Sequence, residues 1–90
     1  MGKKKHRDRY EIVASILEFA HGEERVGITK LMYFSFLPYH SVKLYLDILT
    51  KEGLLERDKL DKYYKITRKG QRTLAIFNEM NEMLKPEKSD

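Results

Sequence analysis

The sequence has no cysteine and no hydrophobic run long enough to cross a membrane. Without cysteine the chain has no disulfide framework and no thiolate metal site, which suits a reducing compartment. A membrane-spanning helix needs about 18 apolar residues. The longest mostly apolar stretch, residues 31–39, is half that length and contains Pro38. We therefore expect a cytoplasmic protein without a membrane partner.

Motifs for catalysis are equally scarce. The histidines, His6, His21 and His40, are scattered, and the five glycines form neither a phosphate-binding loop nor a dinucleotide fingerprint. A metal site built on His21, Glu23 and Glu24 is conceivable, but three polar residues in a loop that ends a helix are usually only solvated. We expect no enzyme activity, no cofactor and no metal.

Charge is abundant: charged residues make up 36% of the chain, against roughly 25% in an average soluble domain, and the net charge is +4. Residues 1–10 contain five bases and one acid (+4), and residues 59–72 contain six bases and one acid (+5). The first cluster lies in a basic, flexible tail at residues 1–8, and the second runs from a turn into the last helix. Both can touch a phosphate backbone. The alternative is that lysine-rich tails and turns simply keep a small protein soluble.

Ninety residues, 41% of them hydrophobic, allow one small domain. Its first helix is predicted at residues 9–20. Asp8 followed by Glu11 is typical of a capping box, in which the first side chain accepts hydrogen bonds from free N–H groups at the helix start. The buried face of this helix is predicted from a regular apolar stripe, formed by Ile12, Val13, Ile16, Leu17 and Ala20.

Residues 29–53 outline two short helices that meet at a tight turn, which is the pattern of a helix-turn-helix. Thr29 is the expected N-cap of the first helix. Pro38 opens the second, where its missing N–H costs nothing. Gly53 stands where a left-handed closing residue is needed.

The second of these helices, at about residues 38–52, has one face suited to a core. Val42, Leu46 and Leu49 recur at helical spacing. Several polar side chains fall on the faces that this packing leaves free, namely Tyr39, His40, Lys43, Asp47 and Lys51. A helix held from behind in this way can present its front to a DNA groove.

Two short extended runs follow, at residues 54–57 and 63–67, joined by the charged turn DKLDK. Their branched and aromatic residues suit a half-buried pleated surface. Val26 and Ile28 can add a short edge strand to the same sheet. This order predicts an α+β, mostly α fold: a winged helix-turn-helix at residues 9–72, with a two- to three-stranded wing sheet and a C-terminal helix.

The last helix, capped by Thr67 and ending near Lys85, carries more apolar groups than its own domain needs. One face can cover the core, and the other would remain wet in a monomer. We therefore expect residues 73–90 to contain a dimerisation surface and a frayed end. The expected homodimer interface consists of Ile76, Phe77, Met80, Met83 and Leu84. The alternative is a flexible helix end that exposes little of consequence.

Five motifs follow one another along residues 10–77: TKLMY, SxLxYxxVKxYL, KEGLLE, KYYKIT and TRKG. Their order and separations resemble the archaeal winged-helix DNA-binding proteins, which include transcription regulators and small nucleoid-associated proteins that dimerise through a C-terminal coiled coil. The resemblance implies double-stranded DNA as the ligand, no cofactor, and antiparallel pairing of the final helices.

Carried over residue by residue, the resemblance implies a recognition helix in the major groove and a wing on the flanking backbone. The expected DNA-binding residues are Thr29, Lys30, Tyr39, His40, Ser41, Lys43, Lys59 and Lys62. No arginine occurs between Arg25 and Arg57, so we expect a modest base preference.

Phe34 and Phe36 depart from the family pattern, because polar residues are common at these turn positions. They either pack under the first helix or form an exposed aromatic patch. In the second case, the rival hypothesis is a winged helix that serves as a protein-interaction module, using these two residues and the wet side of the last helix. Within the DNA hypothesis, a transcription regulator and a chromatin-organising protein both remain open.

Overall fold

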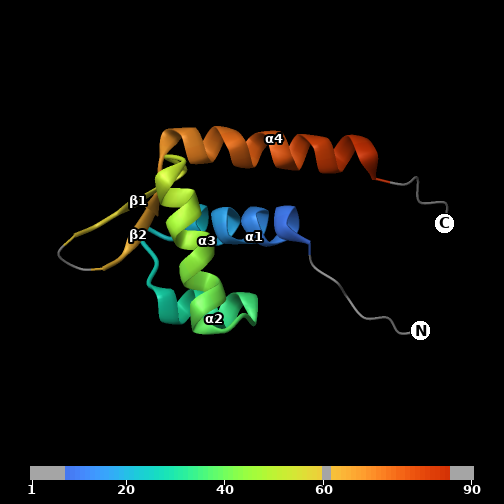
Figure 1. Cartoon of the computed structure of the whole chain (residues 1–90). Helices are drawn as coiled ribbons and strands as arrows, with labels where there is room; N and C mark the ends of the chain where they lie inside the picture. The colour runs from blue at the N-terminus through green and yellow to red at the C-terminus, as the bar shows by residue number, and fades with distance from the viewer. Residues whose placement is uncertain (1–7, 60–61, 86–90) are drawn as a thin grey trace, which may run out of the picture.

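The computed structural model describes residues 8–59 and 62–85. Along the chain the elements are α1 (Arg9–Gly22), α2 (Ile28–Ser35), α3 (Tyr39–Lys51), β1 (Leu55–Arg57), β2 (Tyr64–Ile66) and α4 (Arg68–Leu84). Figure 1 shows α1 and α4 side by side, α3 crossing in front of α1, and the β1–β2 hairpin projecting beyond the start of α4. The predicted mostly helical winged helix-turn-helix is confirmed.

Three sequence predictions fall partly outside the described residues. They are the basic tail, most of which is residues 1–7, the tip of the wing turn at residues 60–61, and the frayed end at residues 86–90. Among the described residues, no helix combines the length and the apolar character that a membrane span requires.

The start of α1 follows the predicted capping chemistry. The Asp8 carboxylate accepts a hydrogen bond from the Glu11 N–H at 3.0 Å. Such a cap satisfies a backbone donor that the first helical turn cannot pair internally. The helix ends at Gly22, two residues later than expected, and its predicted stripe is covered, with Val13 half-buried and the other four residues buried.

The prediction that Thr29 caps α2 is wrong. Val26 exchanges two backbone hydrogen bonds of 2.8 Å with Tyr64. This bridge keeps the chain extended up to Gly27, which is the N-cap of α2. Thr29 therefore lies exposed inside the first helical turn. Ile28 is also helical, so the predicted edge strand reduces to Val26 alone.

The core gathers the inner faces of all four helices and both strands. Val42, Leu46 and Leu49, predicted as the back of α3, are buried as expected. The hydrophobic core cluster as a whole comprises Ile12, Ile16, Leu17, Ala20, Val26, Leu31, Val42, Leu46, Leu49, Leu55, Tyr64 and Leu74. Because the back of α3 is fixed by this cluster, the opposite side of the helix is held in a defined orientation.

A junction between α3, β1 and α4 fixes the end of α3. Gly53 adopts a left-handed conformation with φ of 80°, as predicted. The Thr67 hydroxyl donates to the Gly53 carbonyl at 2.7 Å and accepts from the Gly70 N–H at 2.9 Å, so it caps α4 as predicted. A Cβ at position 70 would collide with the Leu54 carbonyl oxygen. Only glycine lets α4 approach this closely.

The wing is a two-stranded antiparallel hairpin in which Leu55 pairs with Ile66 and Arg57 pairs with Tyr64. Each strand is shorter than predicted, since residues 54, 63 and 67 lie outside the ladder. The Asp58 N–H donates to the Tyr63 carbonyl at 2.8 Å, which closes the base of the turn.

Candidate functional site

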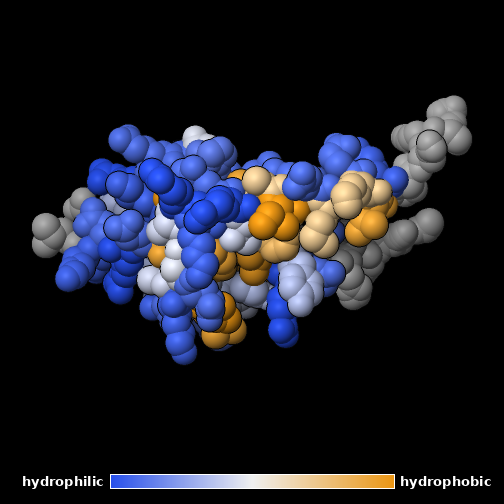
Figure 2. Space-filling model, turned by 90° about the horizontal axis from the view of Figure 1, so that it is seen from above, coloured by the Kyte–Doolittle hydropathy of each residue, from blue (hydrophilic) through white to orange (hydrophobic). Residues whose placement is uncertain are grey.

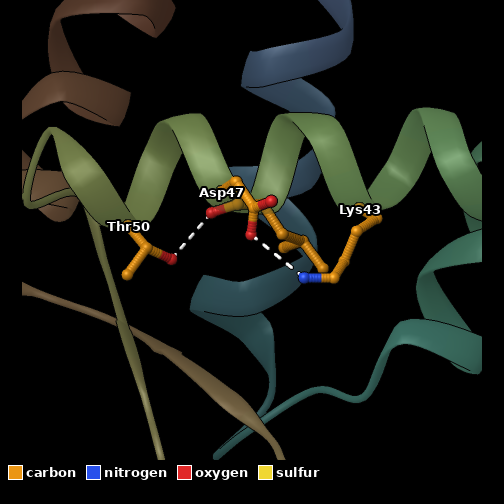
Figure 3. Close-up of polar contacts among 4 residues, drawn as sticks. Lys43, Asp47 and Thr50 are labelled. Carbon is orange, nitrogen blue, oxygen red and sulfur yellow. Dashed lines mark hydrogen bonds and ion pairs between the residues drawn. The ribbon is translucent and has the colours of Figure 1, made fainter.

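The first candidate surface is the front of α3, the side away from the core. Tyr39 and His40 are exposed on its first turn, and Ser41 and Lys43 are half-buried. The Lys43 ammonium lies 3.3 Å from an Asp47 carboxylate oxygen, one helical turn further on (Figure 3). The four α3 residues predicted from the sequence therefore occupy adjacent turns, but the lysine charge is partly matched by its own helix.

Sequence reasoning missed two apolar residues on this front. Leu44 is 58% exposed and Ile48 is 44% exposed, although both belong to residue types that are normally buried. They are four residues apart and lie outside the stripe of buried residues on α3. The sequence could have indicated this exposure, because both residues fall outside the helical spacing of Val42, Leu46 and Leu49.

The second candidate surface is a hollow of about 640 Å³ between the start of α2 and the base of the wing. It brings Lys62 of the wing together with the neighbouring Thr29 and Lys30 of α2, and all three were predicted as binding residues. The full lining consists of Arg25, Gly27, Ile28, Thr29, Lys30, Tyr33, Lys62 and Tyr63. Arg25, Tyr33 and Tyr63 were not predicted, because nothing in their local sequence links the α1–α2 loop to the wing.

The hollow owes its shape to the bridge between Val26 and Tyr64. In antiparallel pairing the neighbours of a bridged pair lie opposite each other, so Gly27 faces Tyr63. A Cβ on Gly27 would lie 3.1 Å from the Tyr63 ring, and the Arg25 guanidinium lies 4.6 Å from the centroid of that ring. Glycine therefore lets the ring lie against the backbone, where it orients the arginine by a cation–π contact.

The chemistry of the hollow suits an anion. Arg25, Lys30 and Lys62 line it, and Lys30 forms a long, exposed ion pair of 4.0 Å with Glu23. The first turn of α2 lines it too, and Gly27 supplies no side-chain cap for the free N–H groups of that turn. Backbone donors, the positive end of a helix and three cations together favour a phosphate or carboxylate group.

The two lysines predicted on the wing differ in their relation to the hollow. Lys59 is exposed on the wing and is not part of the lining. Lys62 belongs to the lining and has a left-handed backbone with φ of 61°, and its N–H donates to the Asp58 carbonyl at 3.0 Å. In residues 8–59 and 62–85 no group of three potential metal ligands is close enough to hold an ion.

The two phenylalanines at the α2–α3 turn behave differently. Phe34 stacks on Phe19 of α1 with ring centroids 4.4 Å apart, so it packs against the first helix. Phe36 is 89% exposed and has a left-handed backbone with φ of 58°. Phe34 therefore agrees with the first alternative only in part, since it is also 44% exposed, and Phe36 is exposed as the second alternative states.

The predicted dimerisation residues form an apolar surface along α4. Seen from above, hydrophobic atoms gather over this helix (Figure 2). Phe77 is half-buried against the core of its own domain, whereas the others remain exposed, namely Ile76, Met80, Met83 and Leu84.

This geometry is that of a winged helix-turn-helix, in which a helix pair is followed by a β-hairpin. A family model described as "Winged helix-turn-helix" matches residues 6–85. The chain therefore belongs to the winged helix-turn-helix family. No curated protein matches it.

Solved structures agree with this assignment. A DNA-binding protein from Sulfolobus solfataricus, Sso10a-2, is 32% identical with a TM-score of 0.66, over 87% of this chain and 85% of that one. The transcriptional regulator BldR from the same organism is 28% identical with a TM-score of 0.64, over 87% of this chain and 63% of that one.

A protein of unknown function from Listeria innocua Clip11262 has a TM-score of 0.71 at 18% identity, over 80% of this chain and 52% of that one. At this identity the likeness concerns the fold alone. The chain spans about half the length of the Listeria protein and less than two thirds of BldR.

Proposed function

We propose that the protein binds double-stranded DNA, with α3 in the major groove and with the hollow and the wing on the flanking backbone. The convergence of Arg25, Lys30 and Lys62 at the start of α2 carries this proposal. Duplex DNA presents a regular array of phosphates beside a groove that admits an α-helix, which matches a cationic hollow beside an exposed helix. The 32% identity to Sso10a-2, a DNA-binding protein, supports the same function.

In this binding mode the hollow takes one backbone phosphate. The N–H groups of the first α2 turn point at it, and Lys30 and Lys62 neutralise its charge. On α3, Tyr39, His40 and Ser41 contact base edges or sugar-phosphate groups from the first turn. Lys43 and the exposed Lys59 add further phosphate contacts.

The biological role we propose is that of a transcriptional regulator or a chromatin-organising protein of archaeal type, acting in the nucleoid. The likeness to BldR supports the first role and the likeness to Sso10a-2 is compatible with either. These roles differ in the ratio of specific to non-specific affinity, which for regulators is typically about a thousandfold or more. Selection of bound fragments from a genomic library, followed by affinity measurements against random duplexes, measures that ratio.

We also propose that the protein is a homodimer that pairs through α4. Four exposed apolar residues on one 17-residue helix would each lose their contact with water against a second copy. Met83→Glu is expected to yield monomers in sedimentation or light scattering, while the control Glu79→Gln on the same helix leaves the dimer intact. A wild-type protein that stays monomeric at tens of micromolar would overturn this proposal.

The test of DNA binding is a salt titration by fluorescence anisotropy on random duplexes. If about six phosphates are neutralised, affinity falls roughly a thousandfold between 50 and 200 mM salt. Replacing Arg25, Lys30 and Lys62 by glutamine should reduce the slope of log affinity against log salt by about 0.9, because the hollow takes one backbone phosphate. The control Lys85→Gln, at the far end of α4, leaves the slope unchanged.

Two results would contradict the binding mode. If the triple variant kept the wild-type slope of log affinity against log salt, the hollow would not be part of the DNA interface. If Lys43→Glu left the affinity unchanged, α3 would not be part of the DNA interface, which would then consist of the hollow and the wing.

A second candidate function is a winged helix that binds another protein. Phe36 favours it, because its aromatic side chain lies in the left-handed region, which is costly, and is 89% exposed among the described residues. Absence of DNA retardation at 50 mM salt would support this function over the first.

A further inference from the structure

The front of α3 exposes two apolar side chains that lie outside the core formed by the described residues. Leu44 and Ile48 are one helical turn apart, and neither belongs to the buried core cluster. With Leu44 58% exposed and Ile48 44% exposed, the pair is only partly buried, and polar residues at the same positions would leave less apolar surface in water. A binding partner is therefore the place to look for their role.

The rest of the helix offers few groups that distinguish bases by hydrogen bonds. Helix α3 (YHSVKLYLDILTK) contains no arginine, which would hydrogen-bond guanine, and no asparagine or glutamine, which would hydrogen-bond adenine. Its lysine at position 43 is engaged by Asp47 at 3.3 Å. In the major groove the thymine C5-methyl is the one apolar group that a base edge presents.

The spacing of the pair fits successive bases. Four residues along an α-helix advance by about 6 Å, and adjacent base pairs are about 3.4 Å apart along the duplex axis. Leu44 and Ile48 can therefore cover methyl groups up to about two base pairs apart. Lys43 and Lys51, on the same helix as the pair, carry charge that complements phosphate rather than an apolar protein surface.

We infer that Leu44 and Ile48 contact thymine C5-methyl groups in the major groove and give the protein a preference for thymine-rich duplexes. This inference rests on the proposed DNA binding and names the base feature that α3 recognises. Covering one methyl group is expected to raise affinity about fourfold, and covering two about fifteenfold.

The experiment compares two duplexes of identical sequence, one with thymine and the other with deoxyuridine at every thymine position. The two differ only in the C5-methyl groups. Wild type should bind the thymine duplex about four- to fifteenfold more tightly. In the double variant Leu44→Ala, Ile48→Ala the two affinities should become equal. Tyr10→Ala removes an exposed side chain of α1 and should keep the wild-type ratio.

Both substitutions are at exposed positions of a helix and to a strong helix former, so the variant is expected to fold, and its thermal unfolding checks this. Equal wild-type affinity for the two duplexes would overturn the inference while leaving DNA binding intact. A thymine preference that survives in the double variant would overturn the assignment to these residues. Absence of binding to either duplex would overturn the proposed function, and the inference with it.

Discussion

Replacing Asp47 by asparagine should strengthen DNA binding. The carboxylate holds the Lys43 ammonium at 3.3 Å on the front of α3, and both side chains are partly exposed. Exposed (i, i+4) ion pairs of this kind are worth about 0.2–0.5 kcal/mol, so releasing the lysine raises affinity by about 1.4- to 2.3-fold at 50 mM salt. Asparagine keeps the size of the side chain and removes a charge that repels phosphate.

The same change should alter the salt dependence in a defined way. Asp47 competes with phosphate for Lys43 in the wild type, so its neutralisation steepens the slope of log affinity against log salt by at most about 0.9, and the advantage of the variant shrinks by at most about 3.5-fold between 50 and 200 mM. The loss of an (i, i+4) pair costs about 0.2–0.5 kcal/mol of stability, which is visible as a small decrease in Tm.

Fluorescence anisotropy at four salt concentrations measures both effects. Glu18→Gln, at an exposed position on α1, makes the same change in net charge and is the matched control. If Asp47→Asn and Glu18→Gln gave the same affinities and slopes, the front of α3 would not face the polyanion, and the binding mode would be wrong.

Three further predictions concern stability and are checked by thermal or denaturant unfolding. Gly70→Ala should cost about 1–3 kcal/mol, because its Cβ meets the Leu54 carbonyl, whereas Gly22→Ala, with open space around it, should be neutral or stabilising. Equal effects of the two changes would contradict the close approach of α4. Thr67→Ala should cost about 1 kcal/mol through the lost helix cap, and Thr67→Ser should recover most of it. Phe36→Asn should stabilise the fold by up to about 1 kcal/mol, because asparagine tolerates the left-handed region better; a destabilised variant would show that the ring contributes to packing.

Local chemistry was predictable from the sequence wherever neighbouring residues determine the structure. Asp8 and Thr67 cap helices because their side chains reach backbone donors three residues away, and this holds wherever the helix packs. Gly53 is left-handed for a similarly local reason. The buried stripe of α3 follows from helical periodicity.

Features that depend on distant pairing were not predictable in the same way. The cap of α2 moved from Thr29 to Gly27, because the bridge between Val26 and Tyr64 sets where the extended chain ends. The same bridge brings Arg25 against Tyr63, a contact between the α1–α2 loop and the wing that no local pattern indicates. The sequence therefore predicted Thr29, Lys30 and Lys62 of the hollow, but not Arg25, Tyr33 and Tyr63.

The two halves of the candidate site have separate structural supports, which implies that affinity and base preference can be changed independently. The hollow depends on the Val26–Tyr64 bridge and on the space left by Gly27. The front of α3 depends on Leu46 and its neighbours behind the helix and on the junction at Gly53. In the proposed binding mode the hollow supplies phosphate contacts, which are insensitive to sequence, and the α3 front supplies base contacts, which are less sensitive to salt. Substitutions in the hollow should therefore change the salt slope and leave the ratio of thymine to deoxyuridine affinity intact, while those at Leu44 and Ile48 should do the reverse.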